Sequence, residues 1–186
     1  TRTCATCCRL LLPGDVRAGV SSIDEKRVYG GREGARTLYL ATEAGVVRVA
    51  VAGDRVGEFG VVAPGPARDV AVADGRLVVA GETDVTCDGD PTGLGPCLAV
   101  GDGAAGGVLA VTTDGTVCRP DGPALGTVPD ARAVDGDLVA SPDGLYRVTD
   151  GVAGVGLTDV RDVAGGARPL AATGDGLYAL GPGWHR

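Results

Sequence analysis

The chain has 186 residues, including 33 glycines and 11 prolines, and only 3% of its residues are aromatic. Its formal net charge is −7 at pH 7, so it lacks the excess of cations that a broad nucleic-acid-binding face requires. It also lacks an apolar run of about 18 residues, so no membrane helix is predicted.

The acidic residues are mainly Asp, and Lys26 is the one lysine. This balance suits concentrated salt, because salt screens the repulsion among carboxylates. A GC-rich genome would favour the same residue types, and both explanations stay open.

Residues 1–20 differ from everything that follows. They contain three of the six cysteines (Cys4, Cys7 and Cys8) and none of the repeat pattern described below. Their short apolar run follows directly on Arg9 and is too brief for a secretion signal. We therefore expect 1–20 to be a non-native or disordered extension of a cytoplasmic domain that covers 21–186.

The rest of the chain repeats with a period of about thirty residues. Each unit begins with an apolar strand that ends at a glycine-containing turn, and the clearest example is 67–73 before Asp74-Gly75. Further units begin at 97, 131 and 160. A second hairpin follows in three of them, with turns at Asp114-Gly115, Asp143-Gly144 and Asp175-Gly176. Asp-Gly between apolar runs predicts a tight hairpin, because a type I′ turn needs positive φ at both central residues.

Four short strands fit in each unit, and no unit has room for a helix of about ten residues. The pattern predicts an all-β fold, a β-propeller made of four-stranded antiparallel blades. A β-solenoid is the structural alternative, but its coils are usually shorter and do not need two tight reversals. Propellers close with roughly 4–8 blades, and 21–186 holds about four to five, ending in mid-unit. We therefore expect a partial domain with an incomplete ring.

Two sequence stretches, RDVAVADGRLVVAG (68–81) and SPDGLYRV (141–148), resemble the blade signature of YVTN and WD40-like propellers. Segment 23–180 also resembles an uncharacterised family of haloarchaeal β-propeller proteins. The residues that carry this resemblance are IDEKRVYG (23–30), GVVRVAV (45–51), DRVGEFG (54–60) and DPTGLGP (90–96). The resemblance implies a propeller fold and a halophilic archaeal source, and it implies no activity.

Two motifs have the spacing of known sites but not their structural context. Residues 101–106 match G-x-G-x-x-G, but they fall on a hairpin turn and not before a helix. The run Asp88, Asp90, Thr92 begins like a calcium loop, but its twelfth position is Ala99, which has no carboxylate. With one histidine and three serines, the chain is poorly supplied for nucleophilic catalysis. We expect no cofactor and no dedicated metal site.

The cysteines of the repeat region also have a simple interpretation. Cys87 and Cys118 take strand positions that Arg48 and Arg147 hold in other units. Free, buried thiols are therefore expected, and a Cys87–Cys97 disulfide is the alternative.

The candidate ligand-binding residues are Arg68, Arg132 and Arg161. Each begins the first strand of its unit, which lines the central channel of a propeller. Three guanidinium groups at one channel mouth could bind an anion, although each could instead pair with a neighbouring carboxylate such as Asp69 or Asp162. We expect a scaffold or binding module for a protein partner or a small anion, and not for nucleic acid or membrane. The alternative is a hydrolase or lactonase-like enzyme at the channel mouth that uses Asp and a divalent cation.

Overall fold

The computed structural model describes residues 34–120 and 122–186. This part of the chain folds into nineteen β-strands and contains no helix. Accordingly, no helix in the described ranges is long and apolar enough to cross a membrane.

The strands form five antiparallel sheets, numbered here in chain order. Sheet 1 contains β1 (Arg36–Thr42), β2 (Gly45–Ala52) and β3 (Arg55–Pro64). Sheet 2 contains β4 (Ala67–Ala73), β5 (Arg76–Gly81), β6 (Val85–Cys87) and β7 (Asp90–Pro91). Sheet 3 contains β8 (Cys97–Asp102), β9 (Val108–Thr112), β10 (Thr116–Cys118) and β11 (Gly126–Thr127). Sheet 4 contains β12 (Ala133–Asp135), β13 (Leu138–Ala140), β14 (Leu145–Val148) and β15 (Val152–Gly154). Sheet 5 contains β16 (Val160–Ala164), β17 (Leu170–Thr173), β18 (Gly176–Leu180) and β19 (Trp184–His185).

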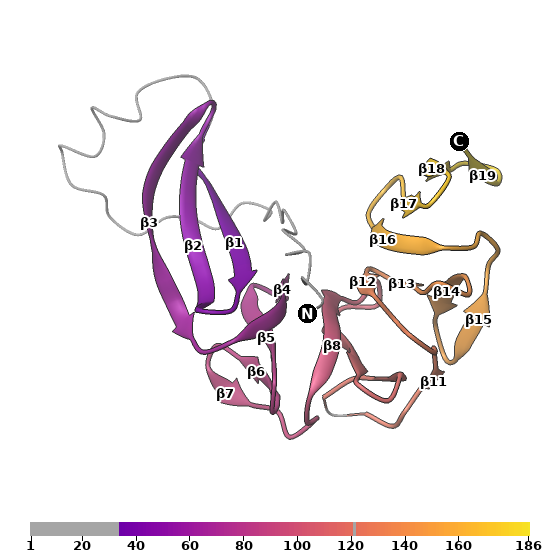
Figure 1. Cartoon of the computed structure of the whole chain (residues 1–186), viewed down its shortest axis with the longest axis horizontal. Coiled ribbons are helices and arrows are strands. Elements are labelled where there is room, and N and C mark those ends of the chain that lie inside the picture. The colour runs from indigo at the N-terminus through magenta and orange to yellow at the C-terminus, as the bar shows by residue number, and fades with distance from the viewer. Residues whose placement is uncertain (1–33, 121) are drawn as a thin grey trace, which may run out of the picture.

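Each sheet is a meander in which every strand pairs with the next one along the chain. The first strands β4, β8, β12 and β16 contact one another in that order, and the sheets follow one another around an open arc (Figure 1). The predicted all-β propeller with four-stranded antiparallel blades is confirmed in sheets 2 to 5, whereas sheet 1 has three strands in the described part of the chain, and the described sheets do not close into a ring.

The core is divided among the four junctions between successive sheets. Each junction holds its own cluster of buried apolar side chains, so every inner sheet is packed on both faces. In junction order the clusters contain Val46 with Val70, Val78 with Val100, Val111 with Val134, and Leu138 with Val160. Small and β-branched side chains dominate these clusters, because the sheets approach one another closely near the first strands.

The hairpins between the first and second strands agree only in part with the Asp-Gly prediction. Asp74 and Gly75 have φ of 50° and 76° and form the predicted two-residue turn. In sheet 4, Asp135 still pairs with Leu138, so the turn residues are Gly136 and Asp137. In sheet 3 a five-residue loop, 103–107, follows Asp102. Asp therefore ends the first strand in both of these sheets and does not occupy the turn itself.

In four of the five sheets, the turn after the second strand of the repeat uses a hydroxyl side chain that sequence reasoning overlooked, whereas Gly81 holds this place in sheet 2. Thr173 Oγ1 accepts a hydrogen bond from Asp175 N over 3.1 Å and donates to Gly176 O over 3.0 Å. Thr42 does the same with Ala44 N and Gly45 O, and Thr112 and Ser141 stand at the corresponding places. Because Thr42 ends β1 and begins the turn to β2, these two strands correspond to the second and third strands of the other sheets.

Candidate functional site

The three predicted arginines lie at the same end of three first strands. Arg68 is the second residue of β4, Arg161 is the second residue of β16, and Arg132 directly precedes β12. Arg132 still belongs to the hydrogen-bond ladder of sheet 4, because its backbone N–H donates to Ala140 O over 2.8 Å. All three side chains are exposed. We call this end of the first strands the arginine mouth.

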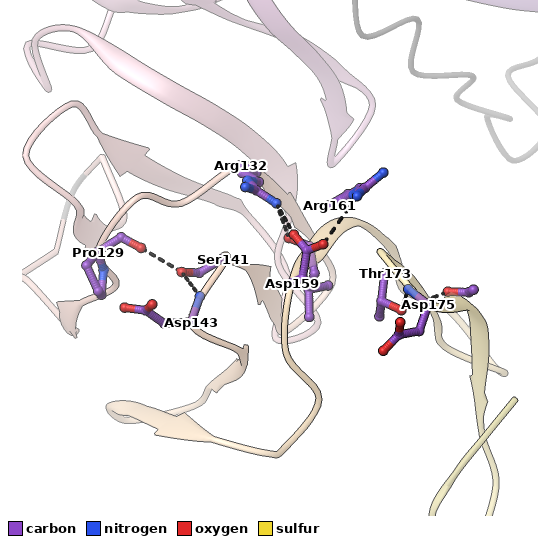
Figure 2. Close-up of polar contacts among 10 residues, drawn as sticks. Pro129, Arg132, Ser141, Asp143, Asp159, Arg161, Thr173 and Asp175 are labelled. Atoms are coloured by element: carbon purple, nitrogen blue, oxygen red, sulfur yellow. Dashed lines mark hydrogen bonds and ion pairs between the residues drawn. The ribbon is translucent and has the colours of Figure 1, made fainter.

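Two of these arginines bind the same carboxylate, as Figure 2 shows. Arg132 Nη1 lies 3.0 Å from Asp159 Oδ1, and Arg161 Nη2 lies 3.2 Å from Asp159 Oδ2. Arg132 Nη1 also donates to the carbonyl oxygen of Val160 over 3.4 Å. Asp159 therefore ties the start of sheet 4 to the start of sheet 5.

The two guanidinium groups also change the acidity of this carboxyl. The hydrogen bonds from Arg132 and then Arg161 hold the pKa of Asp159 below its ordinary value. The carboxylate is thus kept ionised, and one oxygen faces each arginine. Asp159 was not a candidate in the sequence, because it lies in a loop and only the fold brings it between the two arginines.

Arg68 differs from the other two. Within the described ranges it makes no hydrogen bond or ion pair, and the neighbouring Asp69 is used elsewhere. Asp69 Oδ1 accepts the N–H of Val70 over 2.9 Å, and Asp69 Oδ2 accepts the N–H of Val100 over 3.0 Å. Joint binding of an anion by all three arginines stays a prediction.

The opposite ends of the first strands are acidic. Asp74, Asp102 and Asp135 come from sheets 2, 3 and 4 and line one hollow of about 640 Å³, which we call the acidic mouth. Burial, followed by the charges of Asp74 and Asp135, raises the pKa of Asp102 above its ordinary value. Arg147 also lines this hollow, and its Nε lies 2.8 Å from Asp137 Oδ2. Each first strand in these sheets thus leads toward an acidic end, opposite the arginine mouth.

The motifs that resemble known sites have structural explanations. The glycine-rich stretch 101–106 covers the end of β8 and most of its hairpin loop. Asp88 Oδ1 accepts the N–H of Leu77 over 2.8 Å, and Asp88 Oδ2 lies 3.2 Å from Arg76 Nε. Thr92 Oγ1 donates to Val85 O over 2.9 Å. Within the part of the chain that the structure describes, no group of three His, Cys, Asp or Glu side chains could hold a metal ion.

Cys87, Cys97 and Cys118 are free thiols, and all three are buried in the junction between sheets 2 and 3. Burial, with a smaller effect of Cys118, raises the pKa of Cys97 to about 12. The sequence analysis gave Cys87 and Cys118 the same strand position as Arg147, and for Cys118 this was wrong. Cys87 occupies the same ladder position as Arg147, but Cys118 lies one ladder position nearer to the turn. The turn before β10 contains one extra residue, and this shifts the register.

Comparison with known proteins supports the fold that these contacts describe. No curated protein shows a significant match to the chain. Residues 22–186 match the model of the family described as Beta-prop_HVO_0234:-like, beta propeller. The match covers all five sheets and agrees with the resemblance seen in the sequence. The chain therefore belongs to this β-propeller family, which bears a haloarchaeal name.

Proposed function

We propose that this propeller is a non-catalytic binding module that holds an anionic group of a protein or small-molecule partner at its arginine mouth. The observation that carries the proposal is the shared carboxylate of Asp159 between Arg132 and Arg161. It supports the proposal because a carboxylate fits between guanidinium groups at this mouth. Guanidinium groups bind carboxylate and phosphate through paired N–H donors, which favours recognition of such groups.

Donors remain at the arginine mouth after Asp159 is bound. A guanidinium group has five N–H donors, and Arg161 uses one of them on Asp159. Arg68 uses none on a described residue. We propose that a partner carboxylate or phosphate binds at Arg68. The same group also accepts hydrogen bonds from those N–H groups of Arg132 and Arg161 that do not bind Asp159.

The alternative of a hydrolase with a divalent cation rests on the carboxylates of the acidic mouth. These come from strand ends and turns, and no described cluster has three ligands that could hold a metal ion. The observations therefore favour the binding module.

Calorimetric titration of the full chain with citrate, at constant ionic strength, tests this proposal. We expect saturable binding and a higher melting temperature in citrate than in chloride, and both effects should be lost in Arg68→Ala. Arg36→Ala, which removes an exposed arginine from β1, is the matched control and should bind citrate as the wild type does. General exclusion of citrate from the protein surface would stabilise both variants equally, so the difference between them reports the site. Equal binding by Arg68→Ala would overturn the proposal.

A further inference from the structure

A β-bulge recurs near the start of the first strand in sheets 2 to 5. The ladders of β4, β8 and β16 each skip one residue there, and the skipped residues are Arg68, Leu98 and Arg161. In sheet 4, Arg132 N donates to Ala140 O and Ala133 pairs with the same residue, so two residues face one. Bulges re-aim a side chain and are frequent beside binding and active sites. The bulges therefore present one side chain per sheet at the arginine mouth.

Leu98 is the one apolar side chain among these bulge residues. It stands between Arg68 on sheet 2 and Arg132 on sheet 4, because the first strands follow one another in chain order. Its neighbours Cys97 and Ala99 are fully buried in the junctions on either side of sheet 3. Leu98 itself is partly exposed and is not part of the core clusters of the described sheets. Sheets 2, 3 and 4 are each covered on both faces by a described sheet, so this stretch of the mouth is bounded on both sides.

Prolines extend the apolar surface in front of three first strands. All three are exposed, and they are Pro66 before β4, Pro96 before β8 and Pro129 before β12. Thr113 N donates to Pro96 O over 3.1 Å, and Ser141 Oγ donates to Pro129 O over 2.7 Å. A proline has a fixed φ and two of these carbonyls are anchored, so little conformational freedom is lost when a partner covers them. We call Leu98 and the three prolines the apolar rim.

Three carboxylates near the arginine mouth already have partners within the chain. Asp69 accepts two backbone N–H groups, and Asp159 lies between two arginines. Asp162 Oδ1 accepts the N–H of its neighbour Val163 over 2.9 Å. Arg68, in contrast, makes no hydrogen bond or ion pair with a described residue. The mouth therefore offers guanidinium donors directly beside a rigid apolar surface.

We propose that the partner at the arginine mouth is an acidic peptide segment that carries an apolar side chain beside its carboxylates. The inference rests on the proposed function and specifies its ligand: a carboxylate binds the arginines, and the apolar side chain packs on the apolar rim. A small inorganic anion uses the arginines alone and leaves this rim exposed. Protein interfaces are enriched in arginine, and an apolar anchor at their centre supplies much of the affinity.

Calorimetric titration of the full chain at constant ionic strength tests this proposal with acetylated, amidated peptides. Glu-Glu-Leu-Glu-Glu and Glu-Glu-Ser-Glu-Glu differ only in the central residue, and Gln-Gln-Leu-Gln-Gln lacks the charges. We expect the leucine peptide to bind about tenfold more tightly than the serine peptide, because its apolar side chain is removed from water. The uncharged peptide should not bind. Equal affinity of the leucine and serine peptides would overturn the inference and leave the proposed function standing, whereas absence of binding by the acidic peptides and by citrate would overturn both.

Two variants locate the apolar contact. Leu98→Ser should lose the preference for leucine over serine, because the peptide side chain then has no apolar partner of its own kind. Val62→Ser is the matched control: it removes an apolar side chain that is 43% exposed on β3, and it should keep the preference. Thermal melting checks that both variants are folded, and the comparison of peptides on the wild type needs no variant. A preference that persists in Leu98→Ser would overturn the inference.

Discussion

Asp69 on β4 and Val100 on β8 join two blades through one hydrogen bond, in which Val100 N donates to Asp69 Oδ2 over 3.0 Å. A hydrogen bond to a charged acceptor contributes more than a neutral one, about 1.5–3 kcal/mol. This bond crosses the junction that also holds the three buried cysteines. A polar contact therefore sets the position of one first strand against the next, beside an apolar core.

We expect Asp69→Ala to lower the free energy of unfolding by about 1–3 kcal/mol, because Val100 N loses a charged acceptor. Asp162→Ala is the matched control, since Asp162 makes the equivalent bond to its own neighbour but none across a described junction. Urea unfolding of both variants at low protein concentration measures the difference. Equal losses of stability in the two variants would show that the bond between sheets contributes nothing.

Gly101 provides a second test of the packing between first strands. A Cβ at this position would lie 2.8 Å from the carbonyl oxygen of Val134 and 3.0 Å from its Cγ1. Gly101→Ala must therefore push β8 away from β12, and we expect a loss of about 1–3 kcal/mol in urea unfolding. Gly60→Ala is the control, because an added Cβ there meets nothing within 4 Å. A stability equal to that of the control would contradict the close approach of the two strands.

The acidic mouth predicts a pH-dependent stability. Burial and the charges of Asp74 and Asp135 raise the pKa of Asp102 above its ordinary value of 3.8, so the charged form disfavours the folded state. This penalty is complete above the raised pKa and disappears as the pH falls through it toward 3.8. We expect Asp102→Asn to raise the melting temperature at neutral pH.

The gain from Asp102→Asn should shrink on acidification and also in molar salt, which screens the repulsion from the two neighbouring carboxylates. The control is Asp150→Asn, which removes an exposed charge from a turn of sheet 4. Melting curves over a range of pH compare the variants. A melting temperature unchanged by Asp102→Asn at neutral pH would refute the prediction.

The three buried thiols predict slow alkylation in the folded protein. The pKa of Cys97 is raised to about 12, so its thiolate is scarce at neutral pH, and burial restricts access to all three sulfurs. After treatment with iodoacetamide, peptides that contain Cys87, Cys97 or Cys118 should be unmodified in the native state and fully modified in denaturant. Mass spectrometry resolves each site. Protection of Cys87 and Cys97 that persists in denaturant without reductant would instead indicate a disulfide.

Local residue patterns predicted much of the fold. Asp74 and Gly75 form the expected two-residue turn, because the φ requirement is a property of the two residues themselves. The same dipeptide at 135–136 was misread by one position, since the ladder that pairs Asp135 with Leu138 decides which residues turn. Thr173 and its equivalents were overlooked because a hydroxyl group before a turn has many other uses in a sequence.

The candidate site was predictable only in its outline. The repeat placed Arg68, Arg132 and Arg161 at equivalent ends of three strands, since period and strand direction are readable along the chain. That Arg132 and Arg161 share the carboxylate of Asp159 required the packing of sheet 5 on sheet 4. Side-chain pairing across a junction depends on the position of one sheet relative to the next, which no local pattern specifies.

The sequence by itself determined the all-β class, the thirty-residue unit and the direction in which each first strand runs. These depend on alternation, on turn residues and on spacing, all of which act over a few positions. Only the tertiary structure decided that Leu177 on sheet 5 is exposed where Val85 on sheet 2 is buried. The two residues stand at the same place in their units, and what differs is whether another sheet lies against them.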